Sequence, residues 1–239
     1  MDIPTDFQHQ AMGYDRTSTM FSPEGHLLQV EYAEKTVRLG SSSVGMICAD
    51  GVFIIADRRT EDKLIVKESA NKIYEIDSHI IVSVAGIISD ARVLVERAQV
   101  LSQQHRVTYD SPVEPELIIK DIANVEQQFT QYGGARPFAV SFMLAGINRK
   151  KTELYTSDVT GNYFSYHANA IGENDEKIRE ELREKYKQTL TIKQGVKLVL
   201  DIFKEVQEKK FNISKFELVY ISKEDGKLKR IEGEEINRL

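Results

Sequence analysis

The sequence contains a single cysteine, and this scarcity sets the first limit on what the chain can be. Cys48 is the only cysteine among 239 residues, so no disulfide can form within the chain. A chain without disulfides suits a reducing compartment, and we expect a cytoplasmic protein. Cys48 lies in the apolar run SVGMICAD with no partner histidine suggested nearby. We therefore interpret it as a small buried hydrophobe and not as a nucleophile.

Long apolar runs and an excess of positive charge are also missing. No run approaches the length of about 20 apolar residues that crosses a bilayer, so no membrane partner is expected. The first ten residues, MDIPTDFQHQ, lack the basic flank and apolar block of a secretory signal. The net charge of −5 argues against nucleic acid as the main partner, because phosphate binding needs concentrated Lys and Arg.

Motifs for common cofactors and metals are absent as well. The sequence has no GxxxxGK[ST] phosphate loop, no GxGxxG turn after a strand and no HExxH pair. A metal site needs ligands at suitable spacing, and we expect neither a metal nor a cofactor. The five histidines are scattered along the chain: His9, His26, His79, His105 and His167.

The chain does contain an ordered alternation of strand and helix patterns. Runs with apolar residues at consecutive positions, such as FIIA and IIVSVA, are typical of strands that are covered on both faces. Predicted strands lie at residues 43–48, 52–57, 72–76, 79–85, 138–147, 153–157, 163–166, 168–171 and 217–221, with one more after the Glu224-Asp225-Gly226 turn. Predicted helices lie at residues 90–106, 116–131, 175–186 and 192–208, the last opening on a Thr191–Gln194 capping box.

The order of these elements predicts the fold class. Four strands followed by two helices occur twice, and a strand pair closes the chain. Runs of strands followed by runs of helices favour an α+β layer fold over alternating βαβ units. Because the strands are expected to be covered on both faces, we predict a four-layer α-β-β-α sandwich. Residues 14–239 would form this single domain, and residues 1–13, which are polar, aperiodic and terminal, would form a mobile tail.

The most specific segment reads YDRTSTMFSPEGHLLQVEYA, from Tyr14 to Ala33. Its Ser22–Gly25 stretch marks a turn, and the apolar residues after it recur at helical spacing, which predicts an extra N-terminal helix. The segment closely resembles the amino-terminal signature of proteasome α-subunits. Further resemblance lies in ANKIYEID, AGIISDARVLVERA and QYGGARPFAVSFMLAGI, and it weakens after about Gly172. The plain termini resemble those of archaeal members of the family.

The resemblance implies both a fold and a function. The fold is that of N-terminal-nucleophile hydrolases, two antiparallel sheets between helix layers, which agrees with the predicted sandwich. The function is that of a non-catalytic α-subunit of an archaeal-type 20S proteasome core particle. In that role, seven α-subunits would form an outer ring on the catalytic β-subunits, restrict the admission of substrate for protein degradation, and dock an activator such as a regulatory ATPase through its carboxyl terminus.

The alternative is a peptidase that uses Ser41 as its nucleophile. The run GSSSVG resembles the start of a mature proteasome β-subunit, where cleavage before the nucleophile exposes a free amine. Against that pattern, Ser41 falls at the nucleophile, Asp57 at the acidic residue and Lys72 at the lysine that lowers the nucleophile's pKa.

Chemistry favours the inactive interpretation of Ser41. A hydroxyl nucleophile needs a base, which in this fold is an α-amino group with an ordinary pKa of roughly 7.7–8.0. Forty residues precede Ser41, so its nitrogen is an amide and not a base. A third possibility, a ring-forming protein without a β partner, stays open.

The resemblance also implies roles for residues near the predicted pore. Residues 1–13 resemble the gating tail that lies over the axial pore. Arg16 matches an arginine that pairs between subunits. Tyr14, Asp15, Pro23 and Tyr32 match the cluster that holds the tail upright in the open gate. The loop that narrows the pore is matched by Tyr132, Gly133, Gly134 and Ala135.

A further implied site is the activator pocket between adjacent α-subunits. A terminal carboxylate needs a fixed cation and backbone N–H groups that it can approach. Lys72 matches the lysine of this pocket, and Gly25 and Gly86 match glycines that give access to the backbone. Glu31 matches a nearby acidic residue. Without the family, Lys72 would be interpreted as a surface lysine at the end of a strand.

Two positions depart from the family pattern near this pocket. Asn71 precedes Lys72 where the family often has glutamate. Leu39 stands where a second basic residue is common. Both departures bear on the electrostatics of the pocket and on the activator that it accepts.

Overall fold

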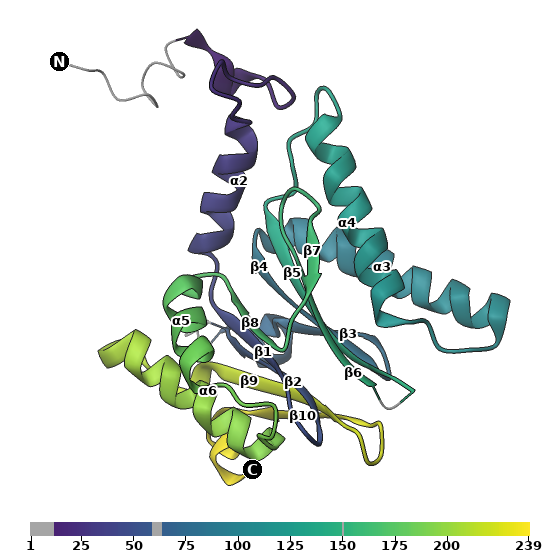
Figure 1. The fold of residues 1–239 in the computed structure, drawn as a ribbon, viewed down its shortest axis with the longest axis vertical. Helices are drawn as coiled ribbons and strands as arrows, with labels where there is room; N and C mark the ends of the chain where they lie inside the picture. The colour runs from purple at the N-terminus through teal and green to yellow at the C-terminus, as the bar shows by residue number, and fades with distance from the viewer. Residues whose placement is uncertain (1–11, 59–63, 150) are drawn as a thin grey trace.

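The computed structural model of the chain describes residues 12–58, 64–149 and 151–239. Apart from Met12 and Gly13, the tail expected at residues 1–13 lies outside the described residues. Figure 1 shows two stacked sheets with helices on both outer sides, which confirms the predicted α-β-β-α sandwich. Within the described ranges, the helices are too short or too polar to cross a membrane.

In the described residues each sheet has five antiparallel strands. The first sheet has the order β10-β9-β2-β1-β8, formed by β1 (Ser43–Ile47), β2 (Gly51–Asp57), β8 (Ala168–Ile171), β9 (Phe216–Ser222) and β10 (Leu228–Glu232). The second has the order β3-β4-β5-β6-β7, formed by β3 (Ile73–Asp77), β4 (Ile80–Gly86), β5 (Val140–Asn148), β6 (Lys151–Ser157) and β7 (Tyr163–Ser165). The predicted hairpins β1–β2 and β3–β4 are confirmed, whereas pairs such as β1–β8 and β2–β9 join strands far apart in sequence.

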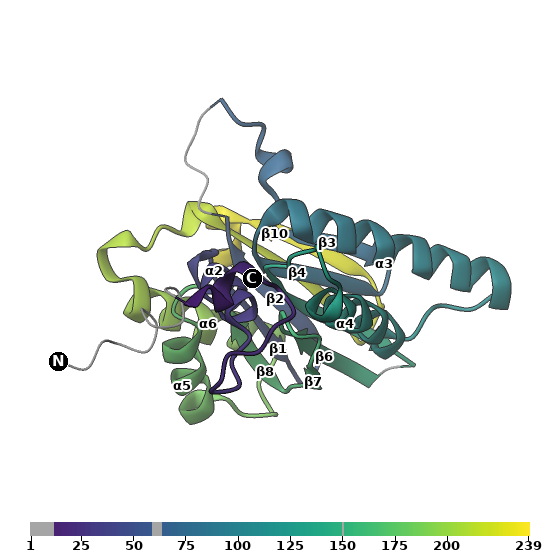
Figure 2. The same ribbon diagram turned by 90° about the horizontal axis from the view of Figure 1, so that it is seen from above.

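Helix pairs cover the outer faces of the sheets. In Figure 2, α3 (Ile88–Tyr109) and α4 (Pro115–Gln131) lie on one side of the strands. On the other side lie α5 (Asp175–Lys185) and α6 (Ile192–Gln207). Short 3-10 segments, which the sequence pattern does not predict, complete the described chain: η1 (Tyr14–Arg16), η2 (Lys67–Ala70), η3 (Glu208–Lys210), η4 (Ile213–Lys215) and η5 (Gly233–Arg238).

The consecutive apolar residues of the strands are explained by burial on both faces. On β2, Ile54 packs between the two sheets, whereas its neighbours Phe53 and Ile55 pack against α6 and its surroundings. All three side chains are fully buried. A strand with one face in solvent would instead alternate apolar and polar residues.

The extra N-terminal helix is α2 (Leu28–Leu39), and it closes one end of the sandwich. Val30, Ala33 and Val37 are buried in the same cluster as the side chains between the sheets. The helix therefore depends on the core for its stability and belongs to the fold.

Boundaries differ slightly from the prediction. Helix α3 runs from Ile88 to Tyr109 and is longer at both ends than the predicted helix at residues 90–106. The Thr191–Gln194 capping box is confirmed, with the Gln194 N–H donating to Thr191 Oγ1 at 3.3 Å and the Thr191 N–H donating to Gln194 Oε1 at 3.0 Å. The predicted burial of Cys48 is confirmed, and burial raises the pKa of its thiol to about 12, so the thiolate is scarce at neutral pH.

Candidate functional site

The candidate site is centred on the junction between α2 and β1, at Gly40 and Ser41. The Glu173 N–H donates to the Gly40 carbonyl at 2.8 Å, and the Ser42 hydroxyl donates to the Glu173 carbonyl at 2.5 Å. The backbone of Gly40 presses against Gly86, where a Cβ on Gly40 would lie 2.4 Å from the Gly86 nitrogen. This close approach explains glycine at position 40 and places Gly86 at the junction.

Lys72 lies in the same corner, and it is not a surface lysine. Only 5% of the residue is exposed, and its ammonium donates to the Ser41 carbonyl. The Lys72 carbonyl accepts the Ser83 hydroxyl at 3.3 Å, and that hydroxyl also hydrogen-bonds Ser43 at 2.7 Å. The interpretation of Lys72 as a surface lysine is therefore wrong, because its side chain is buried against Ser41. The strand itself begins one residue later, at Ile73.

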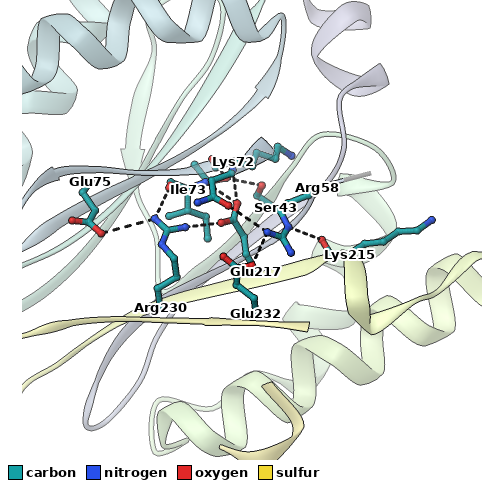
Figure 3. A network of polar contacts seen from close by, with 11 residues as sticks. Ser43, Arg58, Lys72, Ile73, Glu75, Lys215, Glu217, Arg230 and Glu232 are labelled. Atoms are coloured by element: carbon teal, nitrogen blue, oxygen red, sulfur yellow. Dashed lines mark hydrogen bonds and ion pairs between the residues drawn. The ribbon is translucent and has the colours of Figure 1, made fainter. Parts of the chain in front are cut away.

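Glu217, on β9, connects Lys72 to the first sheet (Figure 3). It is fully buried, and its Oε1 accepts the backbone N–H groups of Lys72 and, at 2.9 Å, of Ile73. Arg230, on β10, donates to Glu217 Oε2 at 2.6 Å and to the Ile73 carbonyl at 2.8 Å. Burial raises the pKa of Glu217 above its ordinary value, although the backbone donors and Arg230 oppose that rise.

A second arginine in the network engages the residue before Lys72. The Arg58 guanidinium donates to Asn71 Oδ1 at 3.3 Å, to Glu232 Oε2 at 2.8 Å and to the Lys215 carbonyl at 3.4 Å. The side chain of Arg58 is only 8% exposed. Asn71, one of the two departures from the family pattern, thus makes a contact inside the chain. Leu39, the other departure, is 74% exposed at the end of α2.

The three residues of the peptidase alternative lie near one another, but the contacts that join them run through the backbone. Lys72 bonds the Ser41 carbonyl, and the Asp57 N–H donates to the neighbouring Ser42 carbonyl at 3.0 Å. Asp57 Oδ2 accepts Gln207 Nε2 at 2.9 Å. The Ser41 nitrogen is a peptide amide that follows the packed helix α2, so it is not the free amine that serves as the base in an N-terminal nucleophile.

The gate residues named from the sequence lie where α2 begins. Tyr14, Asp15 and Arg16 form η1, and Gln29 of α2 donates to the Asp15 carbonyl at 2.6 Å. This bond ties η1 to the helix. Asp15 Oδ1 is buried and has no hydrogen-bond partner among the described residues. On the same helix, the Lys35 ammonium lies 5.5 Å from the centre of the Tyr32 ring.

Pro23 and Gly25 lie in a closed turn that leads into α2. The turn is held by Ser22, whose N–H donates to the His26 carbonyl and whose carbonyl accepts the Gly25 N–H, both at 2.9 Å. Gly25 has φ +85°, a left-handed conformation that favours glycine. After the turn, His26 Nδ1 and Glu31 Oε1 lie 2.5 Å apart.

The four residues named for the activator pocket therefore form two groups within one chain. Lys72 and Gly86 lie at the C-terminal end of α2, against Ser41 and Gly40. Gly25 and Glu31 lie at its N-terminal end. Eight helical residues, 32–39, lie between Glu31 and that junction, which corresponds to roughly 12 Å along the axis.

The loop named for the pore connects α4 to β5. Tyr132 is 69% exposed, and the Ala135 N–H donates to its carbonyl at 3.3 Å. Gly134 has φ +86°, and a Cβ on Gly133 or Gly134 would meet no atom within 4 Å. Figure 1 places this loop at the same end of the long axis as η1.

Sequence reasoning did not identify Glu217, Arg230 and Arg58 as members of the site. A signal for one of them was available, because Glu217 is a lone charge in the apolar run FELVYI and a buried acid needs partners. Its partners lie far away in sequence and could not be named. In the part of the chain that the structure describes, no group of His, Cys, Asp and Glu side chains could hold a metal ion.

Comparisons with known proteins agree with this layout. A family profile for proteasome subunits matches residues 37–221, and a profile for the N-terminal signature of A-type proteasome subunits matches residues 14–35. The chain is 41% identical to the proteasome alpha subunit of Thermococcus sibiricus over 94% of this chain and 85% of the relative. It is 40% identical to that of Pyrococcus horikoshii over 95% and 86%, and 39% identical to that of Methanosarcina thermophila over 94% and 91%. The similarity covers both the N-terminal signature and the sandwich.

Proposed function

This chain belongs to the proteasome subunit family and carries the α-type N-terminal signature, and from that premise we propose that it is a non-catalytic α-subunit of the core particle. The observation that carries the proposal is the packing of α2 directly before Ser41. Val30, Ala33 and Val37 are buried in the core, so the helix directly ahead of Ser41 belongs to the fold, which argues against its removal as a leader. Ser41 then keeps an amide nitrogen, which cannot accept the proton of a nucleophile.

We further propose that seven copies form the outer ring, in contact with β-subunits, and that one end of each copy faces the pore. The support is the shared position of η1 and residues 132–135 at one end of the long axis. The gating tail assigned to residues 1–13 would extend from η1 at this end, separate from the domain of residues 14–239. The single, buried Cys48 suits a cytoplasmic location.

Activator docking is proposed at Lys72 and Gly86. In one chain the Lys72 ammonium bonds the Ser41 carbonyl, so a terminal carboxylate from an activator would exchange with that carbonyl. An anionic acceptor makes a stronger hydrogen bond than a neutral carbonyl, which favours the exchange. Gly25 and Glu31 lie too far along α2 to share this contact, and we assign them to the part of the pocket that a neighbouring copy contributes.

The proposal is tested by producing the chain alone and together with a proteasome β-subunit. Without the partner, it should keep the residues before Ser41 by intact mass and hydrolyse no peptide. With the β-subunit, it should co-purify as a ring assembly on a native gel, with peptidase activity that survives Ser41→Ala. A mass beginning at Ser41, with activity lost in Ser41→Ala, would establish the peptidase alternative. Rings that never bind a β-subunit would favour the third possibility.

A further inference from the structure

The start of β3 is held by the opposite sheet and not only by its own neighbour. β3 is an edge strand of the second sheet, paired with β4 alone. Its backbone N–H groups at Lys72 and Ile73 donate to the buried carboxylate of Glu217, which lies on β9 of the first sheet. The Glu217 side chain thus supplies hydrogen-bond acceptors that a neighbouring strand would otherwise supply at this edge.

Arg230 completes this clamp. Its guanidinium joins Glu217 Oε2 at 2.6 Å to the Ile73 carbonyl at 2.8 Å, and it lies 4.0 Å from Glu75 Oε1 (Figure 3). Both backbone groups of Ile73 are therefore bound, the N–H by Glu217 and the carbonyl by Arg230. A planar guanidinium can make such a two-point contact, whereas an ammonium cannot reproduce its geometry.

The clamp holds the backbone of Lys72, whereas the contact of its ammonium is made by the side chain alone. Its N–H is bound by Glu217 and its carbonyl by Ser83. The ammonium, at the end of a flexible four-carbon stem, reaches the Ser41 carbonyl. Re-aiming the ammonium requires only side-chain rotation as long as the backbone stays in place.

We propose that Glu217 and Arg230 are positioning residues of the activator pocket. They hold the Lys72 backbone so that the ammonium passes from the Ser41 carbonyl to an incoming terminal carboxylate without rearrangement of β3. Pre-organisation of this kind strengthens binding because the ordering cost is met before the ligand arrives. The inference rests on the proposed docking role of Lys72.

The test uses the assembled particle with β-subunits and two synthetic peptides. Both carry the carboxyl-terminal residues of a regulatory ATPase, one with a free carboxylate and one with a terminal amide. Interferometry gives the Kd of each, and their ratio measures recognition of the carboxylate. In the wild type we expect the amide to bind about 10- to 100-fold more weakly, as a charge-assisted contact predicts.

Arg230→Met should lower that ratio about tenfold, because the Ile73 carbonyl and Glu217 lose their shared donor. Arg230→Lys should lie between, because it restores the charge without the two-point contact. Glu217→Gln removes the anion that both partners need and should also lower the ratio. A purely structural defect would weaken both peptides equally and leave the ratio unchanged.

Arg106→Met is a matched control. Arg106 pairs at 2.5 Å with Asp77, a buried carboxylate at the other end of β3, so the variant breaks a similar contact on the same strand. Its ratio should remain that of the wild type. Equal loss in Arg106→Met and Arg230→Met would overturn the positioning role.

Lys72→Ala separates the two proposals. A wild-type ratio in Lys72→Ala would refute the docking site itself. A collapsed ratio in Lys72→Ala, with a wild-type ratio in Arg230→Met, would keep the docking site and refute the clamp. If Arg230→Met does not assemble, the test is made with Arg230→Lys and Glu217→Gln. A wild-type ratio of the two Kd values in both variants would then refute the clamp.

Discussion

Arg136 and Asp90 form a two-point ion pair beside the loop at residues 132–135. Arg136 Nη1 lies 2.6 Å from Asp90 Oδ2, and Nη2 lies 2.7 Å from Oδ1. Asp90 also accepts the Ala139 N–H at 3.0 Å, so it joins the first turn of α3 to the chain that enters β5. Burial alone would raise the pKa of Asp90, but Arg136 and the Ala139 N–H outweigh it and hold the pKa below its ordinary value. The ion pair therefore anchors the C-terminal end of the exposed loop to α3.

Arg136→Ala should therefore loosen the loop without touching its exposed residues. If residues 132–135 narrow the pore, the assembled particle should degrade an unfolded protein such as casein faster relative to a short peptide. Loss of about 1 kcal/mol from this pair would lower Tm by about 2–4 °C for a chain of this size. The comparison is made with particles that contain the same active β-subunit.

Arg97→Ala is the control for this prediction. Arg97 makes a similar two-point pair with Asp121 between α3 and α4, at 2.6 and 3.0 Å, away from the loop. It should leave the preference for short peptides unchanged. The same change in both variants would mean that general loosening, and not the loop, sets the selectivity.

Glu126 predicts an unusual dependence of stability on pH. It lies on α4, is fully buried, and neither carboxylate oxygen has a hydrogen-bond partner among the described residues. Burial, together with the charge of Asp158, raises its pKa well above the ordinary value. The folded state then binds the proton more tightly than the unfolded state. Proton binding by Glu126 therefore stabilises the folded state. This stabilisation is fully present below the unfolded pKa of about 4.5 and is lost as pH rises toward the folded pKa.

Glu126→Gln removes this penalty because the amide stays neutral. Near pH 4.5 the variant and the wild type should have similar free energies of unfolding. As pH rises to 8, the variant should become the more stable, by up to about 1.4 kcal/mol per pH unit below the folded pKa. Urea denaturation at several pH values measures the difference. Glu116→Gln, at an exposed position of the same helix, should give no such trend; a difference independent of pH for Glu126→Gln would contradict the prediction.

Deleting residues 1–12 should speed the hydrolysis of short peptides by the assembled particle. A tail that blocks the pore most of the time leaves only a minor open population, of about 10% or less, so its removal should raise the rate about tenfold or more. No catalytic group is altered by the deletion. The rate of the isolated β-subunit serves as reference, and unchanged turnover in the truncated particle would show that the tail is not the barrier.

Lys72→Ala should weaken stimulation by an activator while leaving basal hydrolysis and assembly intact. Loss of a charge-assisted contact worth about 1.5–3 kcal/mol weakens each pocket about 10- to 100-fold, and several pockets act together. Lys72→Arg should not fully rescue, because a planar fork replaces a compact ammonium. Titration of the activator against peptide hydrolysis measures the effect. Failed assembly would instead identify a structural lysine, since the Ser41 carbonyl loses its donor.

Local patterns in the sequence were sufficient to predict the layers of the fold. Doubly covered strands such as β2 appear as consecutive apolar residues, and the Thr191–Gln194 capping box marks the start of α6. Helix α4 shows the limit of such patterns. Apolar spacing predicts that Val125 and Phe129 face inward. Val125 does pack against the core, but both side chains are only half-buried, and the fully buried position between them is Glu126. Apolar spacing predicts the buried face of a helix only where the buried residues are apolar. A buried charged residue such as Glu126 escapes it.

The site was predictable only in part, for a similar reason. The resemblance named Lys72 and Gly86, and the structure brings both to the α2–β1 junction. The carboxylate that binds the Lys72 N–H belongs to Glu217, which lies 145 residues away in sequence. A contact across two sheets leaves no periodic signal in either segment.

The clamp on β3 also affects how copies of the chain can associate. Ile73 has its N–H bound by Glu217 and its carbonyl bound by Arg230, and the Glu75 carbonyl accepts the side chain of Gln99 at 2.8 Å. An open edge strand is a template on which a foreign strand can add, and such additions lead to fibrous aggregates. With these groups already bonded, the edge offers little for strand addition. In the proposed ring, this edge would then not compete, through open-ended strand addition, with the contacts that close the ring.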